Sequence, residues 1–219
     1  MTYAFPKYTS NTRHIAAAIY FLLLQTVYIL TTTIPNASDR VFLLSFCNHI
    51  PLLLGLALLF DWTQFAKAVI NLGVIIQGAW LIDFLVRLVF GFYLFDITEY
   101  VFMGPFFAIP NIVSIIEHSL TMIIAVAVTY KIRPRPISLV YSFLYIAALY
   151  LASLEFTLPV SDVNCVYQQC IFKSLLTVPQ FTALWPAFVM ILGALGYLVQ
   201  RLLYRYFAFP NSASDIPAA

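Results

Sequence analysis

The sequence is poor in charged residues. Only 9% of its 219 residues are Asp, Glu, Lys or Arg, whereas 63% are hydrophobic and the mean hydropathy is +0.93. Soluble domains are about half apolar and a quarter charged, so this composition excludes a soluble globular protein. The formal net charge of +2 gives no indication of nucleic-acid binding. We therefore expect a multi-pass integral membrane protein of the plasma membrane or the endoplasmic reticulum.

The apolar runs predict an all-α, polytopic bundle of six transmembrane helices. A helix needs about 20 apolar residues to cross the hydrocarbon core, because its backbone polar groups must be satisfied within the segment. The stretch 90–110 is apolar but is broken by glycines, prolines and acidic residues. We interpret it as a loop on or dipping into the membrane surface, with a seventh span as the alternative. The six predicted spans are 14–34, 41–60, 68–90, 112–130, 137–156 and 182–204.

The sequence also lacks a signal-peptide cleavage site, an internal repeat and a low-complexity segment, so one membrane domain is expected. With six spans, eight Lys and Arg residues lie on the side of the termini, whereas the opposite loops hold only Arg40 and Lys173. The positive-inside rule then places both termini in the cytoplasm. The predicted organisation is a cytoplasmic segment 1–13, a membrane domain 14–206 with an external loop 157–181, and a cytoplasmic tail 207–219.

Cysteine is scarce, with three residues in the chain. Cys165 and Cys170 lie in CVYQQC inside the predicted external loop, where an oxidising compartment allows a disulfide to persist. Two cysteines supply too few ligands for a structural zinc site. We predict a local disulfide between these two residues, which leaves Cys47 in the second span as a free thiol.

Ionisable side chains gather at one depth of the predicted bundle. A rise of about 1.5 Å per residue places most of them roughly 8 to 12 Å below the outer ends of their helices. The inner half is expected to hold no comparable group, because Lys and Arg there flank the helix ends. Intramembrane charges normally face the bundle interior and mark functional sites. The residues of this level are Cys47, His49, Asp83, Glu117 and His118, with Glu155 near the outer end of the fifth span.

Several of these residues also have a structural interpretation. Asp83 and Arg87 are four apart and could form an ion pair, or Arg87 could bind a phosphate or carboxylate headgroup. His118 could bond to a backbone carbonyl or to a serine such as Ser114, or it could act as a general base. Cys47 could be a small buried apolar side chain, in a turn that a proline four residues later distorts.

Other features are interpreted as structural. Gln25 and Gln77 are single mid-span amides, typical of hydrogen bonds between helices. Gly193 and Gly196 give the last predicted span a narrow face for close packing. The basic turn KIRPRP, residues 131–136, could touch anionic lipid, although topology alone explains its charge.

The order of these features resembles that of a known group of small polytopic membrane proteins. The matching segments, between about Phe42 and Tyr204, are SFCNHIPLLLGLALLF, GVIIQGAWLIDF, IIEHSLTMIIAVAVTY, the turn RPRP and LWPAFVMILGAL. They resemble the family of bacterial YwaF-type proteins and eukaryotic transmembrane protein 164 acyltransferases. The resemblance implies a phospholipid acyltransferase in which Cys47 carries the acyl group and His118 is the nearby histidine. A more distant likeness to the androgen-induced fatty-ester hydrolases would retain His118 and discard Cys47.

Acyl transfer needs a nucleophile, a base that takes its proton, and donors for the oxyanion. We expect Cys47 to be the nucleophile and His118 the base, with Glu117 or Asp83 orienting the imidazole. A lipid-ester hydrolase would use the same groups. The residues expected to contact the lipid are His49, Asn48, Arg87 and Glu155.

Two other classes of function fit the same sequence. A non-catalytic membrane subunit or receptor would use the polar residues as glue between helices and the external loop as a docking surface. A small-solute or proton-coupled transporter would use them as a relay, and it would need polar groups across the inner half as well. No cofactor is expected, and no ligand spacing supports a metal site at His49 and His118. The expected partner is membrane lipid, with a protein at the external loop or a second copy of the chain as alternatives.

Overall fold

A computed structural model of the chain describes residues 12–35, 43–158, 163–166 and 178–208. This described part is helical and contains no β-strand. α1 (Thr12–Tyr28) continues into a π-helical turn, η1 (Ile29–Thr33). The further elements are α2 (Phe46–Leu59), α3 (Thr63–Phe90), α4 (Glu99–Phe102), α5 (Ile109–Thr129), α6 (Pro136–Phe156), the 3₁₀ turn η3 (Val163–Cys165) and α7 (Val178–Phe207).

Within the described ranges, five helical segments are long and apolar enough to cross a membrane: α1 with η1, α3, α5, α6 and α7. α2 is apolar but has only 14 residues. Part of its predicted span, residues 41 and 42, lies outside the described residues. The predicted all-α architecture of membrane-length helices is confirmed, whereas six spans and cytoplasmic termini remain predictions.

The chain between α3 and α5 does not form a seventh spanning helix. It consists of turns and of α4, whose four residues are far fewer than the roughly 20 that a span requires. Gly91 ends α3 in the left-handed conformation, with φ of +80°, which is common after a helix C-terminus. Asn111 of α5 then holds the loop, donating to the carbonyls of Val101 and Pro105 at 3.2 and 3.1 Å.

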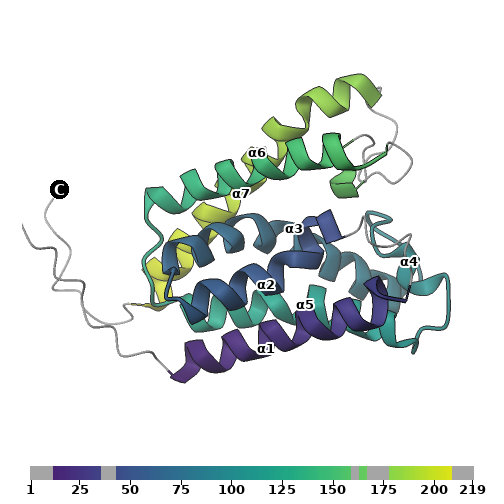
Figure 1. Cartoon of the computed structure of the whole chain (residues 1–219), viewed down its shortest axis with the longest axis horizontal. Coiled ribbons are helices and arrows are strands. Elements are labelled where there is room, and N and C mark those ends of the chain that lie inside the picture. The colour runs from purple at the N-terminus through teal and green to yellow at the C-terminus, as the bar shows by residue number, and fades with distance from the viewer. Residues whose placement is uncertain (1–11, 36–42, 159–162, 167–177, 209–219) are drawn as a thin grey trace, which may run out of the picture.

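α3 is the central helix and packs against α2, α5, α6 and α7, while α1 covers α2 and α5 (Figure 1). Apart from the short α4, successive helices run in opposite directions, so α1 begins and α7 ends at the same end of the bundle. We call this end the inner end. The opposite end, which carries α4, is called the outer end.

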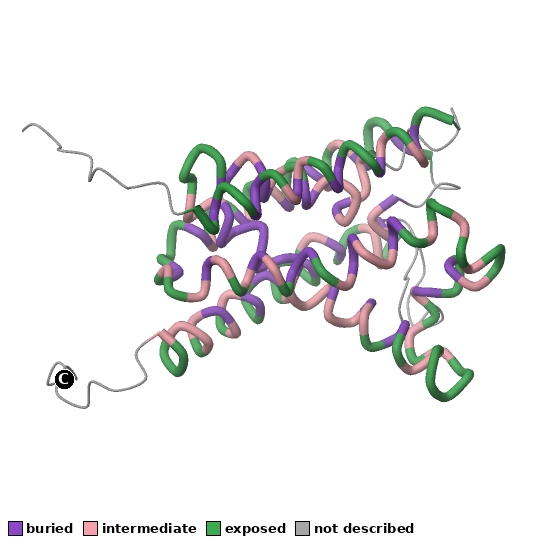
Figure 2. Tube along the Cα trace, turned by 90° about the horizontal axis from the view of Figure 1, so that it is seen from below, coloured by how far each residue is buried: buried purple, intermediate pink, exposed green. Residues whose placement is uncertain are grey.

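The outward faces of the long helices are apolar. Buried positions line the interior of the bundle, and exposed positions follow its outside (Figure 2). Many exposed residues are large and aliphatic, which suits lipid rather than water as the surrounding solvent. Examples from five helices are Leu23, Leu59, Leu88, Leu120 and Leu144.

Two glycines of α7 allow it to approach α3 closely, as the sequence predicted. A Cβ atom built on Gly196 would lie 1.8 Å from the backbone oxygen of Asn71, so the two helices meet backbone to backbone there. A Cβ atom on Gly193 would lie 2.9 Å from a methyl carbon of Leu72. Small residues permit this kind of contact in membrane bundles.

Candidate functional site

Glu117 on α5 is the most unusual buried group of the outer half. The residue is 1% exposed, and neither carboxylate oxygen has a hydrogen-bond partner among the described residues. A buried carboxyl without a partner costs several kcal/mol in an apolar medium. Such a cost is commonest where a side chain serves a function.

The surroundings of Glu117 come from three other elements. Cys47 of α2, Tyr20 of α1 and Tyr100 of α4 all lie within electrostatic range of its carboxyl group. Cys47 is a half-buried free thiol packed against the main hydrophobic core. Two of the predicted site residues, Cys47 and Glu117, therefore lie within range of a charge interaction, although no hydrogen bond joins them.

Other buried polar atoms lie near Glu117, either on the same helix or at the same level of a neighbouring helix. Thr121 is one helical turn away on α5. Its hydroxyl is buried and bonds to no residue of the described ranges, and the same holds for both amide atoms of Gln77 on α3 and for the hydroxyl of Tyr20. We call Tyr20, Gln77, Glu117 and Thr121 the outer polar cluster. Polar atoms of this kind are able to bind water or the polar part of a ligand.

The register of α3 places Gln77 at the level of this cluster. The Trp80 ring stacks on the His118 ring with centroids 4.6 Å apart, and a Cβ atom on Gly73 would lie 2.6 Å from the sulfur of Met122. Residues four and seven apart share a helix face, so Gln77 lies between these two contacts, opposite residues 118 to 122. The predicted role of Gln77 in hydrogen bonding between helices is wrong for this structure, because its amide makes no hydrogen bond with any described residue.

His118 is buried and held in one orientation. Its Nδ1 lies 2.9 Å from the carbonyl oxygen of Ser114, which can only accept, so Nδ1 carries a proton and Nε2 carries the lone pair in the neutral ring. The hydroxyl of Ser114 joins the hydroxyl of Tyr100 at 2.8 Å, and the Trp80 indole donates to that same Tyr100 oxygen at 3.2 Å. The expected bond to Ser114 is confirmed, and His118 forms no hydrogen bond with Cys47.

The start of α2 around Cys47 is fixed from both sides. Gln25 of α1 donates to the carbonyl of Asn48 at 2.9 Å and accepts from the amide of Leu52 at 3.3 Å, so it bridges the turn at Pro51. This confirms the predicted role of Gln25 in joining helices. On the other side Asn164 of η3, at φ of +62°, accepts from the Phe46 amide at 2.5 Å.

Both ring nitrogens of His49 have partners outside the outer polar cluster. Its Nδ1 lies 3.2 Å from the carbonyl of Leu43, and its Nε2 bonds to the hydroxyl of Tyr145, which joins α2 to α6. Both ring nitrogens are therefore engaged within the protein. A substrate contact of His49 would have to replace one of these bonds, so its expected role in substrate binding gains no support from the geometry.

The predicted ion pair between Asp83 and Arg87 is wrong. Asp83 instead accepts from the amides of Leu94 and Phe95 at 2.7 Å and from the amide and hydroxyl of Thr98 at 3.0 and 2.7 Å. The sequence spacing missed this because the loop after α3 folds back and supplies four donors to the carboxylate. Asp83 is thus an anchor for the loop, and none of these four hydrogen bonds involves His118.

Arg87 is also engaged by that loop. Its guanidinium group donates to the carbonyl of Gly91 and lies 4.7 Å from the ring centroid of Tyr93 and 5.6 Å from that of Phe102. Glu155, the other predicted substrate contact near the outer end, is exposed on the last turn of α6. Neither residue is brought to Cys47, and their roles remain predictions.

The inner half is not free of polar side chains, which corrects a sequence-based expectation. The Lys67 ammonium, on a residue that is 2% exposed, donates to the hydroxyl of Thr129 at 3.1 Å. Asn71 donates to Ser142 at 3.1 Å, and Gln200 of α7 donates to Asn71 at 2.5 Å and to the Lys67 carbonyl at 2.9 Å. We call these five residues the inner polar network.

Residues 163–166 of the predicted external loop are packed against the bundle. Val163 and Val166 are buried, and the Asn164 side chain donates to the Leu44 carbonyl at 2.8 Å and to Ser153 at 2.9 Å. Residues 163–166 therefore do not project as a docking surface. Cys170 lies outside the described residues, so the disulfide between Cys165 and Cys170 remains a prediction.

Three members of the site were not found from the sequence. Thr121 could have been found, because it follows Glu117 by one helical turn on the same face. Tyr20 and Tyr100 carry no such signal, because they come from distant segments and aromatic residues are abundant in the chain.

No group of three or more His, Cys, Asp or Glu side chains within the described part of the chain is placed to hold a metal ion. No protein-family model, curated protein or solved structure matches the chain. The resemblance drawn from the sequence therefore rests on its short motifs alone.

Proposed function

We propose that the protein is an intramembrane enzyme that transfers or hydrolyses the acyl group of a lipid ester, with Cys47 as its nucleophile. The observation that carries the proposal is the buried, unpartnered carboxyl of Glu117 within electrostatic range of the free Cys47 thiol. A thiol needs a nearby base to become a strong nucleophile, and a carboxylate without other partners is available for that task.

The proposed reaction has two steps. In the first, the Cys47 sulfur attacks the ester carbonyl carbon while its proton passes through one water molecule to the Glu117 carboxylate, because no hydrogen bond joins the two groups directly. The ester C–O bond then breaks, the leaving alkoxide takes the proton from Glu117, and an acyl thioester remains on Cys47. In the second step an acceptor alcohol or water attacks the thioester, its proton passes through Glu117 to the Cys47 sulfur, and the free thiol is restored.

The other groups of the site have supporting roles in this proposal. The His118 Nε2 carries the lone pair of the neutral ring, so it is a second group able to accept the Cys47 proton in the first step. Gln77 and Thr121 have unpartnered donors that suit the ester oxygen or the acceptor alcohol. The position of Cys47 in the first turn of α2, at the outer end, suits a lipid whose ester lies near the edge of the hydrocarbon core.

The proposal is tested with the full chain purified in detergent. A probe that acylates nucleophilic thiols is applied to the wild type and to Cys47→Ser, Glu117→Gln and His118→Ala, and the acylated residue is found by mass spectrometry. Labelling of Cys47 is expected in the wild type and is expected to fall strongly in Glu117→Gln. Ser119→Ala, one residue beyond His118 on the same helix, is the control and is expected to be labelled normally. An unreactive Cys47 in folded wild-type protein would contradict the enzyme proposal.

A non-catalytic membrane subunit is the second candidate, and one observation favours it. His49, Asp83 and Asn71 all use their polar side chains in bonds between elements of the bundle. If the whole set is structural, Glu117→Gln and His118→Ala change the melting temperature but produce no specific loss of Cys47 reactivity.

A proton-coupled transporter is the third candidate. The inner polar network supplies the buried polar groups that such a carrier needs in its inner half. Proton uptake by proteoliposomes that depends on both Glu117 and Lys67 would favour this candidate over the enzyme.

A further inference from the structure

We propose that the inner end of the bundle carries a binding site for a phosphate group, between the start of α3, the turn from α5 to α6, and α7. A pocket of about 580 Å³ opens there. Its size falls within the range of about 300 to 1,000 Å³ that is common for small-ligand sites. This site is separate from the outer polar cluster and does not depend on the proposed enzyme activity.

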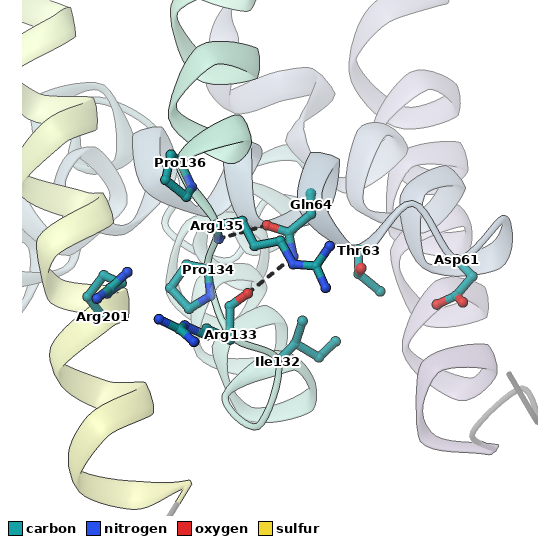
Figure 3. A pocket seen from close by; sticks show the side chains of 9 residues that line it. All are labelled: Asp61, Thr63, Gln64, Ile132, Arg133, Pro134, Arg135, Pro136 and Arg201. Atoms are coloured by element: carbon teal, nitrogen blue, oxygen red, sulfur yellow. Dashed lines mark hydrogen bonds between the residues drawn. The ribbon is translucent and has the colours of Figure 1, made fainter. Parts of the chain in front are cut away.

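Three arginines line this pocket and come from two parts of the chain. Arg133 and Arg135 belong to the turn after α5, and Arg201 lies on α7 (Figure 3). Within the described residues, no carboxylate pairs with any of the three guanidinium groups. A guanidinium group is a planar fork of donors that matches the oxygens of a phosphate, so three around one pocket favour an anion with several oxygens.

The turn that carries two of these arginines is held in place. The Gln64 side chain of α3 donates to the Arg133 carbonyl at 3.1 Å and accepts from the Arg135 amide at 2.9 Å. Figure 3 shows both bonds as dashed lines across the pocket. Pro134 and Pro136 restrict the backbone between and after the two arginines. The backbone positions of the arginines are therefore set before a ligand binds.

Other features of the pocket bear on the charge that it accepts. α3 and α6 both begin at its walls, with Thr63 and Pro136, and a helix N-terminus carries partial positive charge. Asp61 is the one acidic residue of the lining, and it lies at the far end of the pocket from Arg201 (Figure 3). The lining thus has two more positive than negative side chains, and two of the positive ones, Arg133 and Arg201, lie on the side of α7 (Figure 3).

A phosphate group could reach this pocket from two sources. One is the headgroup of an anionic lipid, because the pocket lies at the end of the membrane helices where headgroups are found. The other is a soluble phosphate compound. The positive-inside rule accounts for basic residues at this end of the protein, but it does not require them to line a pocket.

The test compares two pairs of substitutions that remove the same charge. Arg133→Gln with Arg201→Gln removes two arginines of the pocket. Lys131→Gln with Arg205→Gln removes two exposed basic residues from the same turn and the same helix, neither of which lines the pocket. Each full-length protein is placed in nanodiscs and its binding affinity is measured, with phosphatidic acid as the lipid probe and inorganic phosphate, in neutral nanodiscs, as the soluble probe.

The pocket pair is expected to weaken binding at least about tenfold, and the control pair less than about threefold. Saturable binding of inorganic phosphate would identify a soluble source, and binding that requires phosphatidic acid would identify a lipid. An equal loss in both pairs would show general attraction to a basic surface and would overturn the site, as would failure of both probes to bind.

A third variant keeps the proposal testable if the protein with Arg133→Gln and Arg201→Gln does not fold. Arg133→Lys with Arg201→Lys keeps the charge but loses the planar fork. We expect its affinity to fall at least about threefold. Unchanged affinity in this variant would reduce the interaction to attraction between point charges and would overturn the proposal.

Discussion

The inner polar network and the outer polar cluster share helices α3 and α5, yet they differ in how their buried polar atoms are satisfied. In the inner network each side chain makes at least one hydrogen bond, and only Oε1 of Gln200 has none. In the outer cluster the carboxylate of Glu117, the amide of Gln77 and the hydroxyls of Tyr20 and Thr121 have none within the part of the chain that the structure describes. Buried polar side chains in this protein therefore have two roles. Those of the inner network stabilise the fold, and we propose that those of the outer cluster serve a function.

The largest effect is expected where the inner network depends on close helix packing. Gly196→Ala would place a methyl group 1.8 Å from the Asn71 carbonyl oxygen, and backbone atoms cannot rotate away as a side chain can. α7 would have to move, which would also separate Gln200 from Asn71. Overpacking commonly costs about 1 to 3 kcal/mol, and this contact with backbone is expected to lie at the upper end or beyond. The melting temperature in detergent measures the loss.

Gly78→Ala is the matched control for this substitution. A Cβ atom on Gly78, within α3, would meet no atom within 4 Å. Because alanine is a better helix former than glycine by about 1 kcal/mol, no loss of stability is expected. Similar destabilisation by both substitutions would show that the close approach of α7 to α3 is not the cause.

The next prediction compares the two clusters directly on α3. Asn71→Leu removes a side chain that bonds to both Ser142 and Gln200, and leaves their polar atoms without that partner. A loss of about 1 to 3 kcal/mol is expected, because two buried hydrogen bonds of about 0.5 to 1.5 kcal/mol each are lost. Gln77→Met, which replaces an unpartnered amide with an apolar group of similar shape, is expected to be neutral or stabilising. If both substitutions destabilise equally, the contrast between the clusters is wrong.

A smaller and more local effect is expected at Asp83. Asp83→Asn replaces one carboxylate oxygen with an amide that cannot accept from the donors of the loop. The loss is expected to be about 1 to 2 kcal/mol, since charge-assisted bonds are stronger than neutral ones. Hydrogen exchange followed by mass spectrometry should show faster exchange in a peptide covering residues 94–98. An unchanged rate there would contradict the role of Asp83 as the anchor of this loop.

The helices were largely predictable from the sequence, whereas their polar contacts were not. The length of an apolar run fixes a membrane-length helix to within a few residues, as for the predicted span 137–156 and the observed α6. Asn71, Ser142 and Gln200 are ordinary polar residues until the fold brings together helices more than 60 residues apart along the chain. The sequence pattern within a single helix does not predict hydrogen bonds between side chains of different helices.

The candidate site shows the same division. The outer level of Cys47, Glu117 and His118 followed from helix geometry and alternating direction, because depth depends only on position along each helix. The ion pair of Asp83 with Arg87 failed because the spacing within a helix does not reveal a loop that returns to it. The depth of a side chain below the helix end can thus be predicted from the sequence. Which of the polar groups at that depth becomes its hydrogen-bond partner cannot.

The smallest effect on stability is expected at the centre of the outer cluster. Glu117→Gln replaces a carboxyl that makes no hydrogen bond by an amide of nearly the same shape, so the melting temperature should change little or rise, by about 0.5 kcal/mol or less in equivalent free energy. Acylation of Cys47 by the thiol probe should nevertheless fall, because the proposed base is lost. The two readouts together separate the roles, since a structural glutamate would lower stability first and a catalytic one would lower reactivity alone. A strongly destabilised Glu117→Gln protein would show that the carboxyl has partners in the folded state and would remove the distinction between the two clusters.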